Sequence, residues 1–488
     1  MTTQLYHKQK GLSSFFYFFF QFAETQVNEI LYFMIIYDII NMYIFLSAHG
    51  RMAKLLWAER HLFMIIKNIA DGVRLVNIKT DKFKTSRITF TMASPLCGNI
   101  SAKALLPYLL SRRCAKYPDF TEFKGVLDSL YGAAVSAGVS KQGEAMMLTV
   151  SMTAIDDRFA LDGDKITKEC VDLLTDLIFD PVTDGESFPA DIIEEEKRLL
   201  TEKLLAQQND KRRYALDRCE AIMFANEAYG NNCLGTVENI ASLTAKDVYA
   251  QWLDIIKTAQ MQITVVSSCG AEMVTDILTE KLSGKERNPA LIETEFVTGA
   301  PKPNYVSETQ PVKQGKLVMG FRTGMRNADD NADAMRVAVD IFGGGTYSKL
   351  FSVVREKMSL CYYCSAMLVR HKGVVMIQSG IENENEEKAR KEILNQLGEV
   401  AAGNFTNDDF TASVKSLCDS YISYNDTPEE LCEWYAAQIL KEDPCAPEDM
   451  AQRIRSVDRA DVVRSAKTIM LDTVFMLKGN GEGDSNEN

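Results

Sequence analysis

The chain of 488 residues is longer than one hydrophobic core normally supports, and its composition, 46% hydrophobic and 25% charged, is typical of soluble globular proteins with two or more domains. The net charge of −13, without a dense basic run, argues against a nucleic-acid partner, because phosphate binding depends on clustered lysine and arginine. The eleven cysteines are dispersed and odd in number, which favours a reducing cytoplasm over a disulfide framework.

Residues 1–63 form an atypical N-terminal extension with the aromatic and aliphatic runs "SSFFYFFF" and "EILYFMIIYDIINMYIFLSA". The longer run carries Asp38 and Asn41 near its middle, whereas a membrane span needs about 20 apolar residues. An export signal needs a small-residue cleavage site, and no clear one follows. We favour a mis-called translation start, with Met52 or Met64 as the true start, because the dominant residue types have A/T-rich codons. A membrane anchor and an export signal stay open as alternatives.

Residues 64–283 carry mixed strand and helix patterns and form the first expected half. Two short strands flank a turn at Thr80–Asp81, and the helix pattern at about 100–114 is apolar nearly all round, which predicts a buried helix. A hairpin is expected to turn at Lys141–Gly143. A long helix is expected from about 189 to 209, where apolar residues recur at helical spacing.

A similar order of elements recurs over residues 313–480, which form the second expected half. Residues 284–312 are proline-rich and predict an extended linker, while residues 481–488 are too polar to pack and predict a disordered tail. The paired landmarks are Ile240 with Ile454, Phe188 with Phe405, and Leu130 with Leu360. We therefore predict an α+β fold of two homologous halves, each a sheet with a helical layer.

One pair of cysteines, Cys361 and Cys364, has CxxC spacing inside an expected strand. Positions three apart on a regular strand point to opposite faces, which is a poor geometry for chelation. The sequence also lacks a second CxxC. We therefore expect neither a zinc knuckle nor a redox role here.

The stretch "GGGTYSKLFSVVREKMSLCYYCS", residues 343–365, carries the strongest motif of the chain. Together with the order of elements, it resembles the second half of the pitrilysin, or insulinase-like, metallopeptidase family. The resemblance extends from Met64 to about Gly479. It implies a clamshell in which two homologous halves enclose a chamber for a peptide.

In active members of this family, a helix of the first half carries His-x-x-Glu-His, whose two histidines bind zinc while the glutamate activates water. The equivalent positions here are Ala104, Pro107 and Tyr108, and the place of the third ligand falls on Glu202 or Lys203, with Lys203 in the register that we prefer. The four histidines of the chain are His7, His49, His61 and His371, none of them on this helix. The resemblance thus implies a pseudopeptidase without a metal or other cofactor.

The same resemblance places Arg355 and Tyr362 where active members polarise the substrate carbonyl and hold the oxyanion. Without zinc they have no oxyanion to stabilise. Two interpretations stay open: retained binding of a peptide carbonyl, or relics of an ancestral site.

Within the family, "ALLPYLLSRRCAKYPDF" and "NDKRRYALDRCEAIMF" resemble a non-catalytic bacterial branch associated with 5-aminopentanol modification of elongation factor P. The resemblance implies a regulatory or substrate-positioning subunit of an active zinc-containing homologue, forming a hetero-oligomer that handles an extended peptide or protein. The alternatives are a free-standing peptide-binding module and an accessory to maturation or export of a ribosomally made peptide. A membrane role is expected only if residues 1–50 belong to the native protein.

Overall fold

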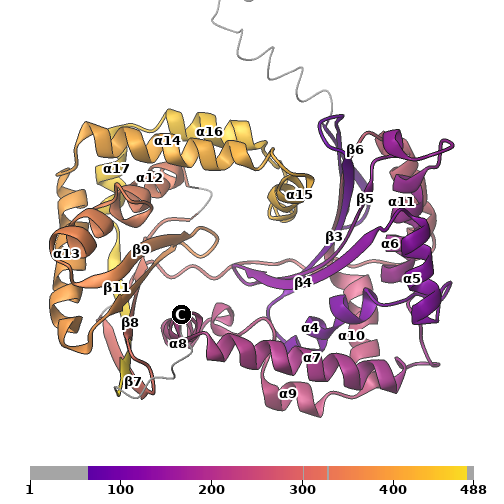
Figure 1. Cartoon of the computed structure of the whole chain (residues 1–488), viewed down its shortest axis with the longest axis horizontal. Helices are drawn as coiled ribbons and strands as arrows, with labels where there is room; N and C mark the ends of the chain where they lie inside the picture. The colour runs from indigo at the N-terminus through magenta and orange to yellow at the C-terminus, as the bar shows by residue number, and fades with distance from the viewer. Residues whose placement is uncertain (1–63, 301, 327–328, 481–488) are drawn as a thin grey trace, which may run out of the picture. The chain divides into compact units, whose positions relative to one another are not determined.

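The computed structural model describes residues 64–300, 302–326 and 329–480, so the expectations for residues 1–63 and 481–488 lie outside the described residues. Two mixed β-sheets, each with helices packed against it, make up this part of the chain (Figure 1). A search of the described residues finds no helix with the length and apolarity that a membrane crossing needs.

The first sheet has six strands in the order β1-β2-β6-β3-β5-β4. They are β1 (Met64–Ala70), β2 (Val73–Lys79), β3 (Thr85–Pro95), β4 (Ala134–Gln142), β5 (Ala145–Ile155) and β6 (Gln260–Ser267). The hairpin of β4 and β5 turns at Gly143, as predicted, with a positive φ of 56° that suits glycine. Residues Thr80–Asp81 do lie between β2 and β3, but β6 separates these two strands and runs parallel to β2.

With the exception of α8, the helices of the first half lie against this sheet and around its end (Figure 1). They are α4 (Ile100–Leu110), α5 (Phe120–Ser129), α6 (Ile166–Phe179), α7 (Ala190–Asn209), α8 (Lys211–Met223), α9 (Val237–Ser242), α10 (Ala245–Thr258) and α11 (Ala271–Leu282), with short 3₁₀ turns η1 (Asp157–Phe159) and η2 (Ala228–Gly230). Helix α4 is buried on nearly every side, as its apolar pattern predicts. It therefore lies in the main core of this half, together with Phe90 and Ile178.

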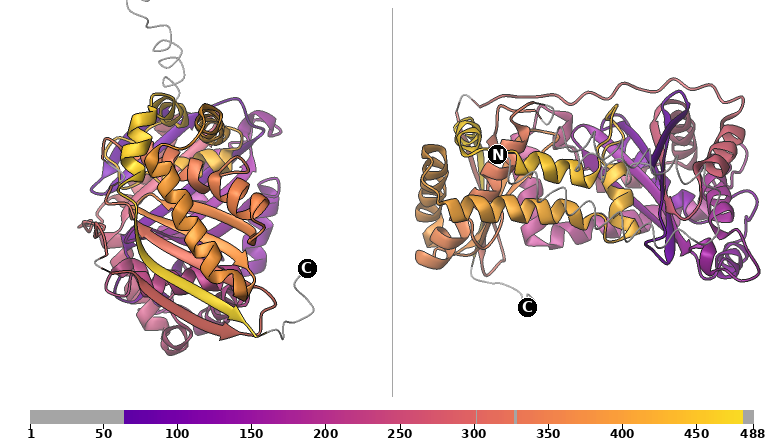
Figure 2. Two further views of the ribbon diagram at one scale, coloured as in Figure 1. Left: turned by 90° about the vertical axis from the view of Figure 1, so that its left-hand side faces the viewer. Right: turned by 90° about the horizontal axis from the view of Figure 1, so that it is seen from above.

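The second sheet has five strands in the order β7-β11-β8-β10-β9. They are β7 (Asn304–Gln310), β8 (Gly315–Arg322), β9 (Cys361–Val369), β10 (Val374–Ile381) and β11 (Met470–Gly479). The helices are α12 (Ala332–Gly343), the π-helix η3 (Leu350–Lys357), the short η4 (Asn383–Asn385), α13 (Glu386–Ala402), α14 (Asn407–Ser423), α15 (Pro428–Ala436), α16 (Pro447–Arg455) and α17 (Arg459–Ala466). Strand β7 lies within the expected linker, and residues 285–300 form neither helix nor strand, running as an extended segment (Figure 2).

The two sheets share one topology. The order β2-β6-β3-β5-β4 corresponds to β7-β11-β8-β10-β9, and in each sheet only the first of these pairs is parallel. Such agreement in order and direction supports the duplication that the sequence landmarks indicate. The fold is the predicted α+β arrangement of two homologous halves.

Each half contributes one helix to the sheet of the other. Helix α8 packs against β8 and β11, and α15 packs against β3 and β6 (Figure 1). The Gln262 side chain donates a hydrogen bond of 2.9 Å to the Tyr435 carbonyl oxygen, and Arg74 donates one of 2.9 Å to the Gln438 carbonyl oxygen. These buried polar contacts fix the two halves to each other because leaving either donor unpaired would cost free energy.

Candidate functional site

A pocket of about 310 Å³ lies where α4 and α7 approach the edge strand β4. Its lining residues are Tyr108, Ser111, Arg112, Ala137, Glu196, Leu199, Leu200 and Lys203. It therefore brings together two of the four positions that the resemblance assigns to the zinc motif, Tyr108 and Lys203. The elements that hold them are rigid helices, one of them deeply buried.

Lys203 and Tyr108 contact each other directly across this pocket. The Lys203 Nζ donates a hydrogen bond of 2.5 Å to the Tyr108 hydroxyl and lies 4.6 Å from the centre of its ring. A hydrogen-bonded ammonium and phenol offer donors to a carbonyl or carboxylate oxygen. They offer no pair of imidazole ligands for a metal ion.

The other two positions do not line the pocket. Ala104 is fully buried in the core of the first half, and Pro107 is buried inside α4. A methyl group and a pyrrolidine ring provide neither a metal ligand nor a general base. Among residues 64–300, 302–326 and 329–480, no group of three or more histidine, cysteine or carboxylate side chains could hold a metal ion.

A buried ion pair that we did not predict closes one side of the pocket. Glu196 is only 3% exposed, and its carboxylate lies 2.7 Å from the Arg112 guanidinium. Burial raises the pKa of Glu196, while the positive charge of Arg112 opposes that shift. Other carboxylates of α7 are solvated, as in the exposed pair of Glu202 with Arg198. Glu196 instead lies on the buried, apolar face of α7, between Ile193 and Leu200. A carboxylate at such a position needs a partner of opposite charge, because burying an unpaired charge is costly.

Arg355 and Tyr362 lie in the second half, where Arg355 is partly exposed and Tyr362 is exposed. The Arg355 side chain is 39% exposed, stacks over the Phe351 ring at 4.5 Å and lies 3.5 Å from Glu356. Tyr362 is 62% exposed and donates a hydrogen bond of 3.0 Å to Glu382, a bond that raises the pKa of the phenol. Both groups are therefore accessible to a ligand, since neither is enclosed by other side chains.

Strand β4 supplies a second feature of the candidate site. It ends the first sheet and pairs only with β5 among the described strands. Ala137 of this strand lines the pocket. An edge strand presents unpaired N–H and C=O groups to which an extended peptide can add.

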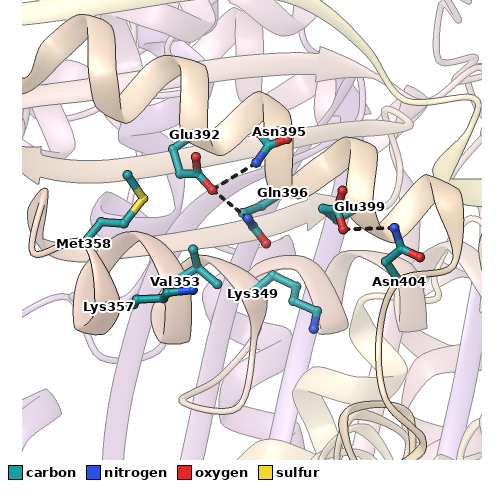
Figure 3. A pocket seen from close by; sticks show the side chains of 9 residues that line it. All are labelled: Lys349, Val353, Lys357, Met358, Glu392, Asn395, Gln396, Glu399 and Asn404. Carbon is teal, nitrogen blue, oxygen red and sulfur yellow. Dashed lines mark hydrogen bonds between the residues drawn. The ribbon is translucent and has the colours of Figure 1, made fainter.

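Another pocket, of about 360 Å³, lies between η3 and α13 (Figure 3). Its polar side chains largely bond to one another: Glu392 accepts hydrogen bonds from Asn395 and Gln396, and Glu399 accepts one from Asn404. Because these groups already have partners, this pocket is a weaker candidate than the one between α4 and α7.

Comparisons with known proteins identify relatives of this chain. Residues 242–417 match the family model described as the peptidase M16 inactive domain. The chain is 31% identical over 421 residues to the probable inactive metalloprotease YmfF of Bacillus subtilis, covering 86% of this chain and 99% of that protein. An uncharacterized zinc protease of Streptomyces coelicolor is 23% identical over 310 residues, which cover 61% of this chain and 66% of that protein.

Solved structures share the fold. A conserved protein from Enterococcus faecalis superposes with a TM-score of 0.79 and 26% identity, covering 86% of this chain and all of that one. A peptidase M16 inactive domain from Pseudomonas fluorescens has a TM-score of 0.69 and 16% identity, covering 86% of this chain and 99% of that one. The chain therefore belongs to the pitrilysin-type M16 peptidase family, as an inactive, non-catalytic member.

Proposed function

We propose that the chain is a regulatory or substrate-positioning subunit that holds an extended peptide for an active, zinc-containing homologue. The observation that carries this proposal is the position of the edge strand β4 beside a pocket that offers hydrogen-bond donors and, among the described residues, no group of side chains that could hold a metal ion. Such a site can bind a peptide, but it has no means of activating water to cleave one.

Strand addition at β4 gives the mode of binding that we propose. Main-chain hydrogen bonds to β4 would supply affinity, and the pocket between α4 and α7 would receive one peptide side chain or carbonyl group. Lys203 and Tyr108 would then donate to that group, in the place where active members hold their zinc. In the second half, Arg355 and Tyr362 would contact the peptide from their exposed positions.

The pairing with a homologue is supported by the packing between the two halves. Helices α8 and α15 each cover part of the other half's sheet, so the fold already contains a self-complementary mode of association. An active homologue with the same two halves could use related surfaces.

The pathway that we propose is the 5-aminopentanol modification of a lysine of elongation factor P. Its support is the resemblance of "ALLPYLLSRRCAKYPDF" and "NDKRRYALDRCEAIMF" to the branch associated with that modification. The second of these segments includes α8. A free-standing peptide-binding role and a role in maturing or exporting a ribosomal peptide are the competing outcomes of the tests below.

Intact-mass measurement of elongation factor P, purified from cells with and without this chain, tests the pathway. We expect deletion to remove or alter the mass of the modification, and expression of the chain to restore it. An unchanged mass in the deletion strain would contradict the elongation factor P assignment while leaving peptide binding open.

A binding measurement tests the peptide mode. A fluorescent peptide spanning the modified lysine of elongation factor P is titrated with the full chain. The matched control is the same peptide N-methylated at alternate residues, which cannot donate strand hydrogen bonds. We expect the control to lose most of the affinity, and equal affinities for the two peptides would contradict strand addition at β4.

A further inference from the structure

Strand β9 has one extra residue, Tyr362, relative to its partner strand β10. Along β10, Ser379 lies opposite Cys364 and Ile381 lies opposite Cys361, and the register shifts between them. Ser379 and Ile381 are two apart on β10 and share one face of the sheet. Their partners Cys361 and Cys364 therefore share that face as well, because a bulge places two residues of one strand opposite one of the other.

This bulge corrects the sequence-based argument against a joint role for the two cysteines. That argument assumed a regular strand, on which positions three apart diverge. Burial agrees with the bulged geometry: Cys361 is 9% exposed and Cys364 is 5% exposed, while Tyr362 between them is 62% exposed. Both cysteines belong to the core cluster of the second half.

The two thiols also interact with each other. A hydrogen bond from Cys364 lowers the pKa of Cys361 against the effect of burial, and the nearby charge of Arg355 lowers it further. The pKa of Cys364 is raised by the same contact and by burial. The pair thus combines a thiol that ionises readily with a protonated neighbour, which is the arrangement of an attacking and a resolving cysteine.

We propose that Cys361 and Cys364 form a reversible intramolecular disulfide, with a hydroperoxide as the oxidant. The Cys361 thiolate attacks one peroxide oxygen, the O–O bond breaks, and with hydrogen peroxide the leaving hydroxide takes up a proton to become water. The Cys364 thiol then attacks the sulfenic sulfur, the S–S bond forms, and a second water leaves with the proton of Cys364. Two thiols are oxidised by two electrons, and one peroxide is reduced to two waters.

The geometry favours a disulfide that is readily reduced again. Neighbouring residues on one face of a regular strand have Cα atoms about 6.8 Å apart, which is also about the upper limit for a disulfide. Closing the bond must tighten the bulge, and a strained disulfide has a more oxidising potential than a structural one. Because Tyr362 is the bulged residue and the charge of Arg355 acts on Cys361, the switch would act on the two candidate peptide-binding groups.

The experiment uses the full chain, reduced, freed of reductant and treated with a graded series of hydrogen peroxide. After quenching with N-ethylmaleimide under denaturing conditions, trypsin cleaves after Lys357 and Arg370 and releases peptide 358–370, which contains both cysteines and no other. We expect this peptide to appear without label and lighter by two hydrogen atoms, and to recover both labels after dithiothreitol. The exposed Cys97 reports the dose at which an ordinary surface thiol reacts.

The variant Cys364→Ser removes the resolving thiol. We expect it to trap a sulfenic acid on Cys361 that a dimedone probe labels, with an unchanged circular dichroism spectrum. Retention of both thiols in peptide 358–370 at a dose that oxidises Cys97 would overturn the proposal, as would pairing of either cysteine with a different one. This result is independent of whether the chain binds a peptide or acts on elongation factor P.

Discussion

The two halves share one strand order and differ in the polar groups that they place around it. In the first half, Arg112 and Glu196 form a largely buried pair beside the pocket between α4 and α7. In the second half, Arg355 and Tyr362 lie exposed, and their carboxylate contacts are with Glu356 and Glu382. Close packing of the core therefore keeps the strand order the same in both halves, whereas the polar side chains around each sheet can take different roles.

The largest effect is expected where the halves meet. Glu227 of the first half lies 2.6 Å from both Arg322 and Lys372 of the second half, and these two cations are almost fully buried. Their hydrogen bonds lower the pKa of Glu227 although burial alone would raise it. Glu227→Ala leaves both charges without this partner and should reduce the free energy of unfolding by about 3–5 kcal/mol in urea titrations.

The matched control is Glu194→Ala, which removes an exposed carboxylate paired with Lys197. We expect it to change the free energy of unfolding by less than about 1 kcal/mol. If Glu227→Ala costs no more than this control, the network between the halves contributes little to stability.

A pH dependence is expected from the contact between the two hairpin turns. His371 lies 3.4 Å from the Gln142 side chain, and burial, together with Arg370, Lys441 and Arg336, lowers its pKa to about 4. The unfolded chain binds this proton below about pH 6.5, and the native chain does so only below about pH 4. The free energy of unfolding should therefore fall by about 1.4 kcal/mol per pH unit within this window, up to about 3 kcal/mol.

Other groups also titrate in that range, so the measurement is a difference between wild type and His371→Asn at each pH. We expect the variant to be relatively more stable as the pH falls from 6.5 to 4. A constant difference across this range would show that His371 ionises alike in the native and unfolded states.

A smaller effect is expected in the pocket of the first half. Glu196→Ala removes the close partner of Arg112, which is itself partly exposed, so the loss should be about 1–2 kcal/mol. The neighbouring Glu195 is more exposed and lies 3.7 Å from the same guanidinium, and Glu195→Ala should cost less than about 0.5 kcal/mol. Thermal or urea unfolding of the two variants distinguishes a buried pair from a solvated carboxylate face.

The smallest effect on stability is expected in the second half. Arg355→Ala and Tyr362→Phe alter exposed groups and should change the free energy of unfolding by less than about 0.5 kcal/mol. Both should weaken binding of the elongation factor P peptide. Unchanged binding in both variants would favour the relic interpretation of these residues.

Local patterns predicted the elements that local physics determines. The long helix α7, the buried helix α4 and the hairpin turn at Gly143 follow from apolar periodicity and glycine conformation. The place of β6 in the sheet, between β2 and β3, could not be predicted from local patterns, because it depends on pairing between strands that are far apart in the sequence. The packing of α8 and α15 against the sheet of the opposite half could not be predicted for the same reason, because it joins residues far apart in the sequence.

In the candidate site, too, some features follow from local sequence patterns and others depend on long-range contacts. Tyr108 and Lys203 line one pocket whereas Ala104 and Pro107 do not, and Glu196 carries a sequence signal because it lies among apolar residues on one face of α7. The bulge at Tyr362 had no sequence signal, because it exists only through the register of β9 with β10. That one inserted residue removes the premise that Cys361 and Cys364 point to opposite faces of the strand.

Metal analysis combined with a peptidase assay on the purified full chain tests the central claim most directly. The account predicts no stoichiometric zinc and no cleavage of peptides, because Ala104, Pro107, Tyr108 and Lys203 supply neither imidazole nor carboxylate. One zinc per chain, together with cleavage that a chelator abolishes and added zinc restores, would contradict it.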